Sequence, residues 1–161
     1  EWLSLLEASG HVLLLKPYYK NFSKRLIKAP KLYFIDTGLA CYLNGWREPS
    51  IVAKGPFAGP IFETYVVGEI LKSYVHRGKE ARIFYFRTKD KIEVDLLIEK
   101  NGRLMPVEIK LSSHVRNEDC KGIEYLKKLG MLLGGGVIVA PVRERYPLRR
   151  GITVVPSSEI S

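Results

Sequence analysis

The chain has 161 residues, with 26 Lys and Arg against 17 Asp and Glu, and its formal net charge is +9. Hydrophobic residues make up 46% of it, which excludes an intrinsically disordered chain, because such chains are poor in aliphatic and aromatic residues. No apolar run approaches the roughly 18 residues that a membrane-spanning helix needs, so we expect a soluble protein without a membrane partner. The positive excess favours a polyanionic partner, although a solvated basic surface explains it equally well.

Two cysteines occur, Cys41 and Cys120, and neither lies in a CxxC pair or near a histidine at metal-ligand spacing. This pattern excludes a disulfide framework and a zinc site. With no signal peptide at the start, we expect a cytoplasmic protein. Because the chain begins with Glu1 rather than Met, inside a predicted helix, we also expect it to be a fragment of a longer protein.

The first 50 residues predict a small winged-helix-like segment. A helix over 2–8 ends at Ser9-Gly10, strands follow at 11–19 and 31–35, and Asp36 is the N-cap of a short helix. From Lys16 to Lys31 the chain is rich in basic residues and has no acidic one. The candidate nucleic-acid-binding residues there are Lys16, Lys20, Lys24, Arg25, Lys28 and Lys31.

Glycine and proline are frequent over 44–60, which predicts a linker. We therefore divide the chain into a segment with linker, 1–50, and a second domain, 51–161. The second domain predicts an α/β fold with a mixed sheet and the order α-β-β-β-α-β, followed by a last strand. The helices are expected from Pro60 to about Val75 and over 118–129, and the strands over 82–87, 91–99, 104–111, 135–140 and 152–155.

Asn101-Gly102 is a strong signal for a two-residue hairpin turn. With that turn, cross-strand partners have residue numbers that sum to 203. One face then pairs apolar residues only, namely Val94 with Ile109, Leu96 with Val107 and Ile98 with Met105. On the other face Asp95 lies opposite Glu108.

Two carboxylates opposite each other are destabilising unless one keeps its proton or a divalent cation binds between them. Lys110 lies on the same face as Glu108. Two carboxylates and a lysine suit a Mg²⁺ site for phosphodiester hydrolysis. Glu63 heads an apolar helical stripe, where a carboxylate needs a cation or a hydrogen-bond donor; a first-turn acid favoured by the helix dipole is the other interpretation.

The order α-β-β-β-α-β with Glu63, Asp95 and Glu108-Ile109-Lys110 resembles the PD-(D/E)XK nuclease superfamily, which has a restriction-endonuclease-like fold. The chain is also similar, from Trp2 to about Ala140, to the C-terminal part of an archaeal and bacterial group of AAA-type ATPases. The stretches that carry this second similarity are Lys31–Leu39, Gly59–Glu63, Phe84–Thr88 and Glu93-Val94-Asp95. Val94 stands where the superfamily name has Pro, and no G-x-x-x-x-G-K-[ST] motif occurs, so this chain carries no ATPase site of its own.

The resemblance implies a metal-dependent nuclease with Glu63, Asp95, Glu108 and Lys110 as catalytic residues. Asp95, Glu108 and Glu63 would be ligands of one or two Mg²⁺ or Mn²⁺ ions. The implied partners are nucleic acid, DNA before RNA, and the ATPase domain of the parent chain; the oligomeric state stays open. The alternative is a catalytically inactive module of that ATPase that binds nucleic acid or protein, and the basic residues would then equally serve to dock the ATPase domain.

Overall fold

The computed structural model describes residues 1–19 and 29–160. Its N-terminal part has the predicted order of elements: α1 (Trp2–Ala8), β1 (Val12–Leu15), β2 (Lys31–Phe34) and α2 (Thr37–Leu43). β1 and β2 form an antiparallel two-stranded sheet. The Asp36 carboxylate accepts the backbone N–H of Leu39 at 2.9 Å, which confirms the predicted N-cap.

The stretch predicted as a linker contains a helix that was not predicted, α3 (Pro49–Lys54). Pro49 occupies the first turn of α3, where its fixed φ and missing N–H are tolerated. The next helix, α4 (Ala58–Val75), begins two residues before the predicted start at Pro60. Glu63 therefore lies in the second turn of α4, which has no acidic residue in its first turn, and the helix-dipole interpretation of Glu63 is wrong.

Six strands form a mixed sheet in the order β3-β4-β5-β6-β8-β7. β3, β4 and β5 are antiparallel neighbours, β5, β6 and β8 are parallel, and β7 is antiparallel to β8. The bounds are β3 (Ile83–Arg87), β4 (Glu93–Lys100), β5 (Arg103–Ile109), β6 (Gly136–Ala140), β7 (Tyr146–Arg149) and β8 (Ile152–Pro156). The predicted α/β class with a mixed sheet is confirmed. β7 was not predicted; it contains Pro147, which an edge strand tolerates and a central strand does not.

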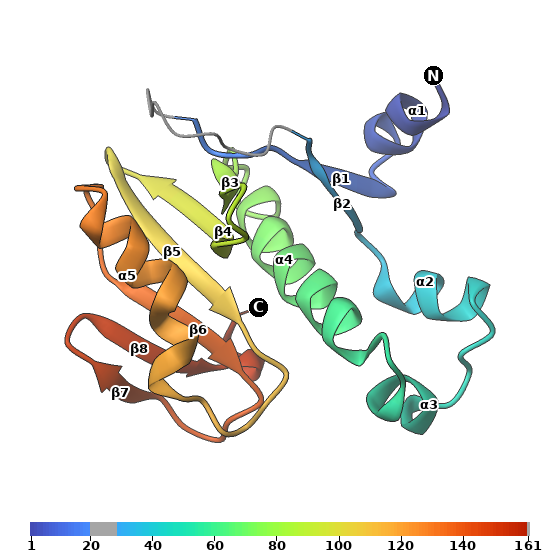
Figure 1. Cartoon of the computed structure of the whole chain (residues 1–161). Coiled ribbons are helices and arrows are strands. Elements are labelled where there is room, and N and C mark those ends of the chain that lie inside the picture. Colours follow the sequence, from blue (N-terminus) through green and yellow to red (C-terminus); the bar gives the residue numbers. More distant parts are fainter. Residues whose placement is uncertain (20–28, 161) are drawn as a thin grey trace.

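One helix covers each face of the sheet (Figure 1). On one face α4 packs its Val66, Val67 and Ile70 against β4 and β5. On the other face lies α5 (Lys121–Lys128), preceded by a 3₁₀ turn at Asn117–Cys120. None of the helices described is long and apolar enough to cross a membrane.

The hairpin β4–β5 has the predicted turn and register. Asn101 and Gly102 both have positive φ, 52° and 72°, and the ladder runs from Lys100↔Arg103 to Leu96↔Val107. Beyond that pair the ladder stops. Asp95 and Leu96 together lie opposite Tyr85 of β3, so β4 carries an extra residue there.

This bulge changes which face Val94 occupies. Leu96 and Ile109 pack in the cluster under α4, whereas Val94 packs with Leu97 and with Leu126 of α5. The predicted apolar pair of Val94 with Ile109 is therefore wrong. The strict alternation of a regular strand was assumed to continue through a position where the strand is bulged.

Candidate functional site

The site begins at the end of the β4–β5 ladder, where the Asp95 side chain, and not a backbone carbonyl, accepts a backbone N–H of β5. Asp95 Oδ2 accepts the backbone N–H of Ile109 at 2.8 Å. This bond fixes the Asp95 carboxylate beside β5, next to the buried carboxyl of Glu108, whose residue is 5% exposed. Lys110 Nζ lies 3.8 Å from Glu108 Oε2.

The two carboxyl groups oppose each other's ionisation. Burial and the charge of Asp95 raise the pKa of Glu108 to about 9, against a smaller opposing effect of Lys110. Burial and the charge of Glu63 also raise the pKa of Asp95, while the hydrogen bond from Ile109 opposes the rise. Ionisation of one carboxyl therefore makes ionisation of the other less favourable, and a positive charge beside the pair favours the ionised forms.

Helix α5 approaches this pair closely because residue 122 is glycine. A Cβ on Gly122 would lie 2.4 Å from Glu108 Oε1 and 2.3 Å from the backbone oxygen of Glu93. The α5 backbone therefore closes over Glu108, which explains why this carboxyl is buried while Lys110 is partly open to solvent.

Glu63 has partners of its own. Lys31 Nζ of β2 lies 3.0 Å from Glu63 Oε1, and the Tyr33 hydroxyl donates to the same oxygen at 2.5 Å. Lys31 also pairs with Glu93, the first residue of β4, and Glu93 pairs in turn with Arg87 at 3.3 Å. Sequence reasoning stated that Glu63 needs a cation or a donor, but it did not identify Lys31 and Tyr33 as the residues that supply them.

Two pKa values reflect this arrangement. Burial lowers the pKa of Lys31, but the charges of Glu63 and Glu93 outweigh it and raise the pKa above its ordinary value. Burial and the charge of Glu63 also raise the pKa of the Tyr33 hydroxyl. Lys31 is therefore a cation and Tyr33 a neutral donor at physiological pH.

The fold brings three of the four predicted catalytic residues together, namely Asp95, Glu108 and Lys110. Glu63 is close enough for its charge to act on Asp95, yet its carboxylate is bound to Lys31 and Tyr33. Within residues 1–19 and 29–160, no three Asp, Glu, His or Cys side chains are arranged to hold a metal ion. Asp95 and Glu108 are thus neighbouring carboxyl groups, while the Glu63 carboxylate has Lys31 and Tyr33 as its partners.

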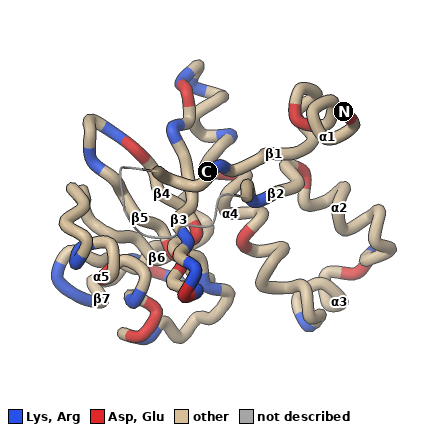
Figure 2. The backbone as a smooth tube through the Cα atoms, turned by 45° about the horizontal axis from the view of Figure 1, so that its top comes forward, with Lys and Arg blue, Asp and Glu red and all other residues tan. Residues whose placement is uncertain are grey.

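The predicted basic face is described only at its two ends. Lys16 is exposed, whereas Lys31 is partly buried in its ion pairs with Glu63 and Glu93. Lys20, Lys24, Arg25 and Lys28 lie outside the described residues. Elsewhere basic and acidic residues are dispersed over the described chain (Figure 2).

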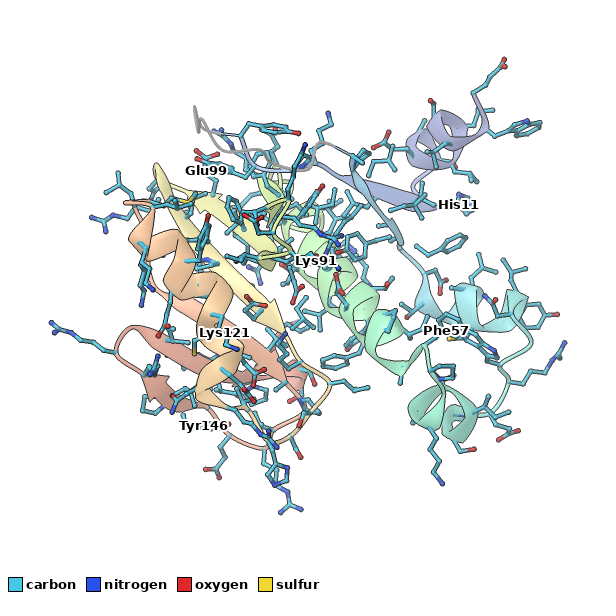
Figure 3. The ribbon with its side chains drawn as sticks, viewed as in Figure 1. His11, Phe57, Lys91, Glu99, Lys121 and Tyr146 are labelled. Carbon is cyan, nitrogen blue, oxygen red and sulfur yellow. The ribbon has the colours of Figure 1, made fainter. Side chains whose placement is uncertain are left out.

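A cavity of about 480 Å³ lies away from these acids, at the opposite end of β4. It is lined by Tyr74, Arg82, Ile98 and Glu99 among others, and by none of the four predicted catalytic residues. Figure 3 labels Lys91 and Glu99 near the two ends of β4, and the cavity is at the Glu99 end.

Comparison with known proteins places the chain among uncharacterised relatives. It is 28% identical over 159 residues to an uncharacterized protein of Mycobacterium tuberculosis and, equally, to one of Mycobacterium bovis. The alignments cover 99% of this chain and 34% of those proteins, so the chain spans about a third of their length. The crystal structure of protein VC1899 from Vibrio cholerae is similar at 18% identity and a TM-score of 0.38, over 99% of this chain and 39% of that one.

Two family models match. Residues 1–50 match a family described as a domain of unknown function (DUF8612), and residues 58–160 match another. The second match spans more than half of the chain. The chain therefore belongs to the family described as Domain of unknown function (DUF4143).

Proposed function

We propose that residues 51–161 form a PD-(D/E)XK nuclease-like domain of a AAA-type ATPase, and that this domain hydrolyses phosphodiester bonds of nucleic acid with a divalent cation. The observation that carries the proposal is the adjacent pair Asp95 and Glu108, with Lys110 beside it. Glu108 is almost fully buried beside a second carboxyl group. Burying two neighbouring carboxyl groups costs stability, so such a pair indicates a functional role.

The residues at this pair fit a divalent cation of the Mg²⁺ type. Carboxylate oxygens are the ligands that Mg²⁺ prefers, and this ion is commonly bound by one or two carboxylates, with waters and substrate phosphate oxygens completing its shell. Asp95 and Glu108 would hold it. When bound, such an ion neutralises phosphate charge and lowers the pKa of a coordinated water.

The other residues have positioning and electrostatic roles. The Ile109 N–H orients Asp95, and the approach of α5 at Gly122 keeps Glu108 away from bulk water. The Lys110 ammonium lies where it can orient an attacking water or stabilise negative charge that develops on a phosphate. The net charge of +9 favours the approach of a nucleic-acid backbone.

The order of elements also supports the proposal. From α4 through β3, β4, β5 and α5 to β6, the domain has the α-β-β-β-α-β order, with an antiparallel β3–β4–β5 unit and a parallel β5–β6 pair. Asp95 and Glu108 lie on adjacent strands of that unit.

Cleavage assays on labelled single- and double-stranded DNA and RNA, with Mg²⁺ or Mn²⁺, test the proposal. Asp95→Asn, Glu108→Gln and Lys110→Met are each expected to lower the cleavage rate by at least about a hundredfold, since the first two weaken the hold on the cation and the third removes the ammonium beside the reacting phosphate. The matched controls are exposed residues: Asp90→Asn, Glu118→Gln and Lys128→Met. No cleavage of any of these substrates by the wild type would contradict the proposal.

A second candidate function is a non-catalytic module that binds nucleic acid or a partner protein. One observation favours it. The Glu63 carboxylate is bound by Lys31 and Tyr33, and it does not join Asp95 and Glu108 in one group of acids. This candidate requires salt-sensitive binding that Asp95→Asn and Lys110→Met leave unchanged, in a protein that cleaves nothing.

A further inference from the structure

Lys31 places a positive charge among acids that come from another part of the chain. Its ammonium contacts Glu63 of α4 and Glu93 of β4, and its charge also acts on Asp95. The side chain is 21% exposed. The ammonium lies 5.5 Å from the ring centroid of Tyr85 and 6.0 Å from that of Tyr33, so aromatic faces as well as carboxylates hold it.

The strand that carries Lys31 belongs to the N-terminal two-stranded sheet, and that sheet is anchored on the larger one. The Tyr18 N–H donates to Tyr85 O at 2.8 Å, and the Tyr85 N–H donates to Lys16 O at 3.1 Å. Tyr33 is buried in the cluster under α4. The position of the Lys31 ammonium is therefore set by the packing of the N-terminal part against α4 and β3.

A second cation near Asp95 has to share these acids with Lys31. Positive charges a few ångströms apart in a partly buried site repel each other strongly, since the effective dielectric constant there is far below that of water. Glu63 and Glu93 can stabilise a divalent ion, directly or through water, only when they are no longer paired with Lys31.

We propose that Lys31 is a built-in counter-cation of the acid cluster, which competes with the divalent cation and moves away from Glu63 and Glu93 when that cation binds. This inference rests on the proposed function, because it assumes a cation site at Asp95 and Glu108. The affinity for the divalent cation then depends on the packing of the N-terminal part against the nuclease-like domain, because that packing positions Lys31. Lys31 is a positioning residue here and has no direct role toward the substrate.

Titration with Mn²⁺, following free Mn²⁺ by electron paramagnetic resonance, tests the competition without any cleavage. Lys31→Met keeps the length of the side chain and removes its charge, so we expect it to bind Mn²⁺ at least about tenfold more tightly than the wild type. The matched control is Lys89→Met, which removes an exposed charge from the turn that leads into β4 and is expected to change affinity by less than about threefold. Equal or weaker binding by Lys31→Met overturns the inference.

A measurement on the wild type avoids the risk that Lys31→Met does not fold. Trace acetylation, read by mass spectrometry, reports how freely each lysine ammonium reacts. Saturating Mg²⁺ is expected to increase the reactivity of Lys31 several-fold and to leave exposed Lys54 unchanged, with no such increase in Asp95→Asn. Unchanged or lower Lys31 reactivity overturns the inference.

These results separate the two proposals. If the wild type binds Mn²⁺ through Asp95 and Glu108 but Lys31→Met binds it no more tightly, the counter-cation inference fails and the cation site stands. If neither the wild type nor Lys31→Met binds Mn²⁺, both fail.

Discussion

Glu108 is a buried carboxyl whose raised pKa makes the stability of the domain depend on pH. Its pKa is raised from 4.5 to about 9 in the folded chain, mainly by burial and then by Asp95. Between these two values the folded state binds more protons than the unfolded state, so the free energy of unfolding falls as the pH rises. The stabilising contribution is complete below the unfolded pKa and is lost as the pH passes through about 9.

Glu108→Gln tests this pH dependence. The amide keeps the shape of the side chain and cannot ionise, so the variant should be more stable than the wild type at pH 8, by roughly 1–3 kcal/mol, and should lose less stability between pH 5 and pH 8. Urea unfolding at a series of pH values measures both effects. Glu118→Gln, at an exposed position, should follow the wild type. An unchanged slope in Glu108→Gln would show that Glu108 ionises normally in the folded protein.

Mg²⁺ should reverse part of the loss at high pH. An ion that binds the folded state alone stabilises it by mass action, and here it also favours the ionised carboxyl groups. We expect Mg²⁺ to raise the melting temperature of the wild type at pH 8 and to raise that of Asp95→Asn much less. Calorimetry with and without the metal measures this. Equal shifts in both proteins would assign the effect to a site elsewhere.

Tyr33 gives a prediction for the Glu63 side of the cluster. Its buried hydroxyl donates to a carboxylate, and hydrogen bonds to charged groups contribute about 1.5–3 kcal/mol. Tyr33→Phe should lower the free energy of unfolding by about that amount, whereas Tyr42→Phe, at a residue that is 58% exposed, should have little effect. Urea unfolding at pH 7 compares the two, and equal effects would mean that the bond to Glu63 adds no stability.

At the scale of elements, the packing of α5 on β4 and β5 depends on Gly122. An alanine Cβ there meets two oxygen atoms at distances that atoms do not adopt, so α5 has to move away from Glu108. Gly122→Ala should destabilise the protein by about 2 kcal/mol or more, although alanine favours helix more than glycine does. Gly59→Ala in α4 is the matched control, since no atom lies within 4 Å of its added Cβ. Urea unfolding of both variants checks this. Similar changes in the free energy of unfolding at the two positions would refute the close approach of α5 to Glu108 at Gly122.

The hairpin shows how far sequence reasoning reaches at this scale. Asn101-Gly102 predicts the turn and the register down to Leu96↔Val107 because both are local properties. The bulge opposite Tyr85 was not predictable in the same way, since it depends on β3, a different strand. The pairing of Lys31 with Glu63 and Glu93 was not predictable for a similar reason, because tertiary packing alone brings these residues together.

At the scale of the whole molecule, the N-terminal part and the large sheet share one hydrophobic core. Leu15 of β1 and Tyr33 of β2 are buried in the same cluster as Val66 and Leu96. Lys31 adds ion pairs across the same contact. The two parts should therefore unfold together, although separate family models match them.

The two tryptophans allow this cooperativity to be measured. Trp2 and Trp46 both lie in the first 50 residues, and Trp46 stacks on Phe57 with ring centroids 5.4 Å apart. Because Trp2 is 82% exposed, the change in tryptophan fluorescence reports mainly on the surroundings of Trp46, while far-ultraviolet circular dichroism is dominated by the helices and the sheet of the whole chain. We expect both signals to give one coincident urea transition with a single midpoint.

Lys31→Met should shift the two midpoints together, because the ion pairs that it removes belong to the shared contact between the parts. A fluorescence transition that precedes the loss of circular dichroism would show that the N-terminal part detaches while the sheet remains folded. Lys31 would then leave the acid cluster by detachment of the whole strand β2, and Mg²⁺ should lower the urea concentration at which fluorescence changes.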